Sequence, residues 1–118
     1  MTIPQDHADF VGRPADAVAA LFPDRQRSQA AATSLRAAGF APLEVRPQHS
    51  ARCRLQDWGG DATIMNLYVE GLRAGHTLLM IPASRADREA VGRLLIQHQG
   101  HAVYYFARDG VESLTVPA

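Results

Sequence analysis

Residues 76–87, His-Thr-Leu-Leu-Met-Ile-Pro-Ala-Ser-Arg-Ala-Asp, predict a strand that leads directly into a helix. The run from Leu78 to Ile81 is apolar at every position, which is typical of a strand covered on both faces. Ser84 and Asp87 have the spacing of a capping box, which marks a helix start. Gly100 ends this helix, and we expect a positive φ at this glycine and at Gly39 and Gly75, which end the other two helices. The apolar stripe of the helix is Val91, Leu94, Leu95 and His98.

A hairpin follows this helix. His101–Ala107 is rich in aromatic and apolar residues and predicts another strand. Arg108-Asp-Gly110 is typical of a tight turn. The remaining stretch, 111–116, then predicts a final edge strand.

The first half of the chain carries the same kinds of signal, less clearly. Composition alone does not distinguish a helix from a strand in residues 16–22, which end at Pro23. Asp24 is a good N-cap for a helix over residues 25–38, and Gly39 ends that helix. Leu43–Arg46 alternates and suits a short strand. Residues 48–60 predict a loop, and residues 61–74 predict a second helix that stops at Gly75.

The order of these elements predicts a mixed α/β (α+β) fold. Setting the middle helix aside as an insertion between strands 2 and 3 leaves βαββαβ, the split-βαβ, ferredoxin-like pattern. In that arrangement the four strands are antiparallel in the order 4-1-3-2, and the C-terminal hairpin adds to them. We expect residues 1–15 to be a flexible lead-in and residues 16–118 to be one ferredoxin-like domain.

Composition excludes several functional classes. The chain of 118 residues has 12 basic and 12 acidic residues and no net charge, so it lacks the basic footprint of a duplex-DNA or membrane-binding protein. Cys53 is the one cysteine, which rules out an internal disulfide and favours the cytoplasm. No catalytic or cofactor-binding motif occurs, so we expect no catalytic residue, metal or cofactor.

Three stretches resemble a known family. They are Ala20-Leu-Phe-Pro-Asp-Arg with Ala30–Phe40, Tyr68–Leu79, and Gly100-His-Ala-Val-Tyr-Tyr-Phe106. Together they are similar to the bacterial general stress protein family, also called heat-induced stress proteins, over residues 16–107. The resemblance implies the fold and a stress-associated role, and it carries over no catalytic residue.

The candidate ligand site lies at one edge of the predicted sheet. His76 and His101 open the two strands that flank the first strand, about 10 Å apart, because neighbouring strands lie about 4.8 Å apart. His98 ends the last helix at the same edge, and the first helix starts there with Arg25 in its first turn. Unpaired N–H groups at a helix start favour an anion. We therefore predict a small anionic or polar ligand on Arg25, His76, His98 and His101. A metal on the three histidines is an alternative, and so are surface histidines without a ligand.

The apolar strands predict a partner. Both faces of the third and fourth strands are apolar, and the two main helices cover only one face. A second copy of the chain, or the middle helix over residues 61–74, is expected to cover the other. The predicted dimer or partner face comprises Leu79, Ile81, Tyr104 and Phe106.

The leading functional hypothesis is a non-enzymatic, stress-associated, homodimeric module that binds a ligand or regulates. One alternative is a small dimeric α/β-barrel-type enzyme with His and Tyr acid–base residues in the sheet cavity. Another is a protein-interaction module that docks a partner on the open sheet face. Arg46, Arg52 and Arg54 with Trp58 suggest single-stranded nucleic acid or simply a solvated loop. Cys53, between two arginines, is either a reactive thiol or an inert one.

Overall fold

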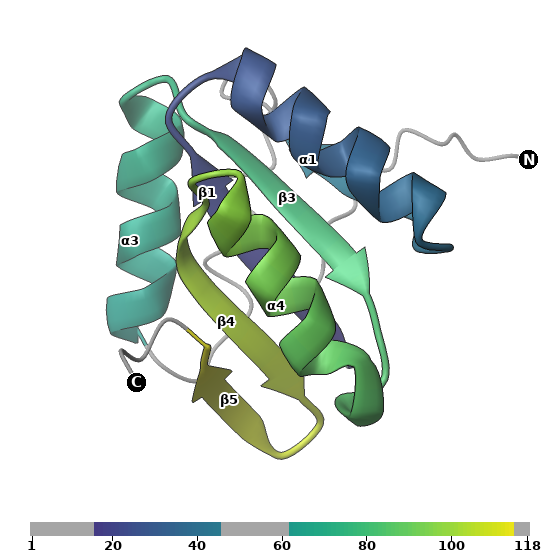
Figure 1. Ribbon diagram of the computed structural model, residues 1–118. Helices are drawn as coiled ribbons and strands as arrows, with labels where there is room; N and C mark the ends of the chain where they lie inside the picture. The colour runs from purple at the N-terminus through teal and green to yellow at the C-terminus, as the bar shows by residue number, and fades with distance from the viewer. Residues whose placement is uncertain (1–15, 46–61, 115–118) are drawn as a thin grey trace, which may run out of the picture.

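The computed structural model describes residues 16–45 and 62–114, which form one five-stranded antiparallel sheet (Figure 1). The strand order is β2-β3-β1-β4-β5, which contains the predicted ferredoxin-like order with the hairpin strand added beside β4. The fold-class prediction is therefore confirmed. The strands are β1 Ala17–Phe22, β2 Leu43–Val45, β3 Thr77–Pro82, β4 His101–Ala107 and β5 Gly110–Ser113.

The helices lie on both faces of this sheet. Helices α1 (Arg25–Ala37) and α4 (Arg88–Gln97) pack on one face, and α3 (Ala62–Arg73) packs on the other. Figure 1 shows α1 and α4 in front of the strands and α3 beside them at the left. A short 3-10 helix, Arg85–Asp87, precedes α4. The helix expected over residues 61–74 thus covers the second face of the sheet.

Strand β1 is at the centre of both cores. Ala17, Ala19 and Leu21 face α3, whereas the alternate residues, among them Val18 and Phe22, face α1 and α4. All six residues of the strand are buried. A strand buried on both faces has no alternation of polar and apolar residues, which is why composition did not separate strand from helix here.

The predicted partner face is wrong as a single surface. Leu79 and Ile81 lie in the core under α1 and α4, whereas Phe106 lies in the core under α3 with Tyr104 packed against it. The register gives the reason, because Leu79 pairs with Ala20 while Phe106 pairs with Ala17, and alternate residues of β1 point to opposite faces. Since α3 covers the second face, the argument that a second copy must cover it no longer holds.

The helix ends follow the sequence signals at most positions. Asp24 caps α1, and Gly39 (φ 97°) and Gly75 (φ 94°) have the expected positive φ. The prediction for Gly100 is wrong. Gln99 has the positive φ (70°), so α4 ends one residue earlier than expected.

The capping box predicted at Ser84 and Asp87 does not form. The Ser84 side chain makes no cap hydrogen bond to the backbone and instead donates to the Asp87 carboxylate at 3.4 Å. The 3-10 turn takes the place of the first turn of the α-helix.

Several expectations fall outside the described residues. They are the lead-in 1–15, the loop 48–60 with Cys53 and Trp58, and the end of the final strand. Within residues 16–45 and 62–114, no helix is both long enough and apolar enough to span a bilayer.

Candidate functional site

The first part of the site is a pair of histidines. His76 follows Gly75, where the positive φ ends α3 and turns the chain toward β3, and His101 is the first residue of β4. Their imidazole rings lie edge to face with centroids 5.3 Å apart and planes at 87°. The prediction that these two residues lie at the same end of the sheet is confirmed. Their side chains contact each other across β1, the strand that separates their backbones.

The pair is polar but poorly satisfied. The Nδ1 atom of His76 is buried and has no hydrogen-bond partner among the described residues. The His101 side chain is exposed. The pKa of the His101 imidazole is lowered, first by partial burial and then by the nearby charge of His76. Both effects favour the neutral form of this ring.

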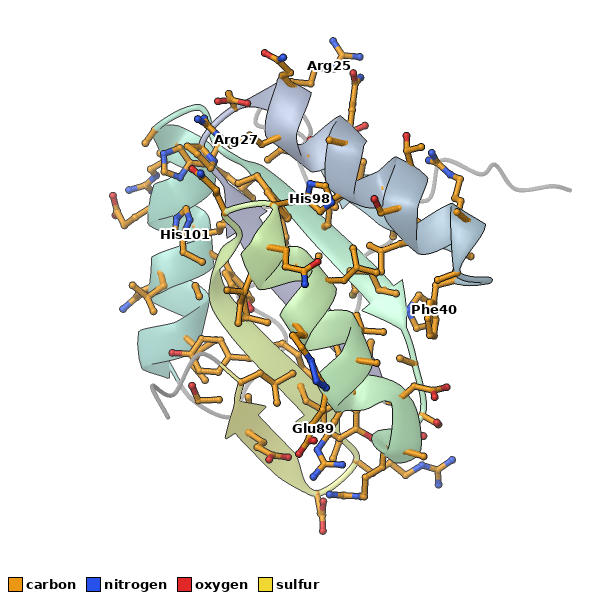
Figure 2. All side chains as sticks on the ribbon, in the orientation of Figure 1. Arg25, Arg27, Phe40, Glu89, His98 and His101 are labelled. Atoms are coloured by element: carbon orange, nitrogen blue, oxygen red, sulfur yellow. The ribbon has the colours of Figure 1, made fainter. Side chains whose placement is uncertain are left out.

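His98 has a different partner. It lies at the C-cap of α4, and its Nε2 atom is 3.1 Å from the Oγ of Ser34 on α1. Figure 2 shows His98 between these two helices. Among the residues that the structure describes, no three His, Cys, Asp or Glu side chains form a group that could hold a metal ion. The predicted three-histidine metal alternative is therefore wrong for the described histidines.

Arg25 does not join the histidines. It is exposed and points outward from the start of α1, away from His98 (Figure 2). The α1 N-terminus is occupied by Asp24, whose carboxylate accepts a hydrogen bond from the Arg27 backbone N–H at 2.8 Å. The same carboxylate forms an ion pair with the Arg27 guanidinium. A negative charge is thus already present where an anion was expected.

A pocket of about 490 Å³ lies between the start of α1 and the end of α4, and we call it the α1–α4 pocket. Its size is within the range of about 300–1,000 Å³ that is typical of small-molecule sites. Of the predicted ligand residues, only His98 lines it. The lining residues are Asp24, Gln26, Arg27, Ala30, Gln97, His98 and Gln99.

Sequence reasoning missed most of this lining. Gln97 and Gln99 flank His98 directly. This run of three polar residues at the end of a helix is the feature of the sequence that could have indicated a polar pocket. Arg27 lies three residues after the N-cap, the position from which a side chain returns to the cap carboxylate. Arg25, in contrast, lies on the outer side of the same turn.

Two other pockets have different chemistry. One of about 250 Å³ lies between α1 and the β2 edge, and its lining includes Arg36 and Glu44. The other, of about 560 Å³, lies between α4 and β5, with Ile96 and Leu114 as its large apolar residues. Among the described residues that line these two pockets there is no histidine.

Comparisons with protein-family models, with curated proteins and with solved structures find no match to this chain. The resemblance to the general stress protein family stays a prediction.

Proposed function

We propose that this chain is a small, non-enzymatic ligand-binding or regulatory domain that holds a polar small molecule in the α1–α4 pocket. The observation that supports the proposal most directly is the lining of that pocket. Three glutamines, Gln26, Gln97 and Gln99, line it together with His98 and the Asp24–Arg27 ion pair.

The lining favours a ligand that both donates and accepts hydrogen bonds. Each glutamine amide offers a carbonyl acceptor and an NH₂ donor. The two charges of the pocket, on Asp24 and Arg27, are paired with each other. A simple anion would have to displace the Asp24 carboxylate from Arg27, whereas a neutral or zwitterionic molecule would not. We therefore propose a neutral or zwitterionic polar ligand in place of the anion that the sequence predicted.

Filling the pocket tests the proposal. Ala30 lines the α1–α4 pocket and is exposed, so Ala30→Phe should occupy part of the space without disturbing the core. Ala37, two turns further along α1 and also exposed, gives the matched control Ala37→Phe. Glucose as a neutral probe and inorganic phosphate as an anion are titrated into ¹⁵N-labelled protein, and amide shifts are followed by NMR.

We expect glucose to shift the side-chain amides of the three glutamines in the parent and in Ala37→Phe, but not in Ala30→Phe. Shifts that are the same in both variants, or that lie outside the pocket, would contradict the proposal. A response to phosphate alone, lost in Arg27→Ala and kept in Arg25→Ala, would also contradict the proposal. It would support an anionic ligand bound by Arg27 and not by the predicted Arg25.

The other parts of the functional hypothesis stay predictions. They are the stress association, the cytoplasmic location and the homodimer, together with the enzyme and interaction-module alternatives. A histidine beside Tyr104 or Tyr105 in a cavity would favour the enzyme alternative, and none of the three pockets described above includes either tyrosine.

A further inference from the structure

The α1–α4 pocket carries one negative and one positive side chain in direct contact, Asp24 and Arg27. Both side chains are 45% exposed, so a ligand in the pocket can reach both charges. A ligand that binds both members of this pair needs a positive group for Asp24 and a negative group for Arg27. Because the two protein groups touch, the two ligand groups must also lie close together.

The ion pair leaves hydrogen-bonding capacity on both partners. A guanidinium has five N–H donors, and Asp24 accepts from the one on Nη1 of Arg27. The Asp24 carboxylate accepts that bond and the Arg27 backbone N–H, whereas a carboxylate has about four acceptor positions. Among the described residues, no other group bonds to either side chain. A ligand can therefore bind both side chains without separating them.

A ligand with a single charge fits this pair poorly. A carboxylate on the free N–H groups of Arg27 would lie beside the Asp24 carboxylate, and like charges at such short distances repel each other. An ammonium group on Asp24 would lie beside the Arg27 guanidinium in the same way. A molecule that carries both groups on one carbon atom satisfies both residues, and it adds no net charge to a pair that has none.

We propose that the α1–α4 pocket binds a free α-amino acid with an uncharged polar side chain, an inference that rests on the proposed function and narrows it. The ammonium group of the ligand donates to Asp24, and its carboxylate accepts from Arg27. An arginine can bind a carboxylate through two parallel N–H donors, which fixes the orientation of the ligand. The side chain of the ligand then lies among the glutamines of the pocket, whose amides both donate and accept hydrogen bonds.

Gln99 supplies one of these amides from a strained backbone position. Its φ is 70°, in the left-handed region that glycine adopts most readily at the end of a helix. Strain of this kind is often found at functional sites, and Gln99 lines the α1–α4 pocket. Gln99→Gly should therefore weaken ligand binding without lowering the urea midpoint. A residue with a purely structural role would not give this combination.

The test is a matched set of ligands, each titrated into the ¹⁵N-labelled full chain and followed by NMR. L-Glutamine carries the ammonium group, the carboxylate and a polar side chain. Glutaramate lacks the ammonium group, 4-aminobutanamide lacks the carboxylate, and L-norvaline has a methyl group in place of the side-chain amide. We expect L-glutamine to bind at least about 3-fold more tightly than each of the others, because a contact with a partly exposed charge or amide is weak.

Two substitutions separate the roles of the two charges. Asp24→Asn keeps a good N-cap residue and should weaken the binding of L-glutamine and 4-aminobutanamide, but not of glutaramate. Arg27→Gln should weaken the binding of L-glutamine and glutaramate, but not of 4-aminobutanamide. Arg25→Gln, in the same turn but exposed and outside the pocket lining, is the matched control and should change none of these affinities. Circular dichroism checks that each variant is folded.

This proposal and the proposed function can fail separately. If glucose shifts the glutamine side-chain amides but L-glutamine binds no more tightly than glutaramate and 4-aminobutanamide, the amino-acid class is wrong and the proposed function stands. Equal losses for all ligands in Asp24→Asn and Arg27→Gln would also overturn the amino-acid class, because they would reflect damage to the pocket. If neither glucose nor L-glutamine shifts these amides, both proposals fail.

Discussion

The imidazole of His76 meets the imidazole of His101 edge to face, with centroids 5.3 Å apart, although β1 separates the strands that the two residues precede and begin. The contact ties the end of α3 to the start of β4 across the central strand. The pKa of the His101 imidazole is lowered by its partial burial and then by this neighbour.

Acid should therefore destabilise the fold through His101. Its pKa in the folded chain is lowered from the ordinary value, so the folded state binds fewer protons than the unfolded state between the two pKa values. The stabilising contribution is complete above the unfolded pKa of about 6.5 and is lost as the pH falls through the folded pKa. We expect the urea midpoint to drop between about pH 7.5 and about pH 5. The drop should be smaller in His101→Gln, and His98→Gln is the control. Equal drops in His101→Gln and the parent would contradict the assignment.

Tyr68 should be the hydrogen-bonding anchor of α3. Its buried hydroxyl donates to the carbonyl oxygens of Ala102 at 3.0 Å and Ala19 at 3.3 Å, and burial raises the pKa of its phenol well above the usual value. Tyr68→Phe should lower the free energy of unfolding by about 0.5–1.5 kcal/mol, the net worth of such a bond. Tyr104→Phe is the control, because Tyr104 shares the same face and is half-buried. Chemical denaturation of both variants measures the difference, and equal midpoints would show that the Tyr68 hydroxyl contributes nothing.

Gly71 should set the distance between α3 and the sheet. A Cβ atom at this position would lie 2.6 Å from a methyl carbon of buried Leu21. Ala is favoured over Gly in a helix by about 1 kcal/mol, but overpacking a core costs about 1–3 kcal/mol. We expect Gly71→Ala to be destabilising in thermal unfolding. Gly92→Ala should be less so, because its Cβ would meet half-buried Leu114 at 3.0 Å. A more stable Gly71→Ala would mean that α3 packs further from β1.

Asp16 should control the ionisation of Tyr105. The phenol donates to the Asp16 carboxylate at 2.8 Å, and this hydrogen bond is the main cause of the raised pKa of Tyr105. Arg85 and Arg88 lie over the ring at 5.5 and 5.9 Å and act in the opposite direction. Asp16→Asn should therefore lower the pKa of Tyr105, as followed by ¹³C NMR of its ring. Asp109→Asn in the exposed turn is the control, and an equal shift in both variants would contradict the contact.

The sheet could be predicted because its signals are local. Glycines, prolines and short apolar runs mark the ends of β3 and β4, and the order of elements then leaves few topologies. The face of each side chain could not be predicted as well. Leu79 and Phe106 were placed on one surface, but their register against β1 sets them on opposite sides, and register is a property of strand pairing.

The site was predicted in part for a similar reason. His76 and His101 came together because strand ends meet at one edge of the sheet. The sequence predicted Arg25 from its place in the first turn of α1. Arg27 lies in the same turn, and its return to the Asp24 carboxylate is a side-chain contact that the sequence pattern does not show. Positive φ was expected at Gly100, but Gln99 has it. Glycine is required at position 100 for a different reason, close packing, because a Cβ there would lie 2.9 Å from both the Leu95 carbonyl oxygen and the Phe22 ring.

Helix α3 supplies from the same chain what a second subunit supplies when two sheets pair. Its residues Ile64, Tyr68 and Leu72 close over Leu21 and Phe106 without any association step. Burial of this face is consequently a first-order process. The free energy that it contributes is the same in a dilute sample and in a concentrated one, whereas a fold completed by a partner weakens on dilution.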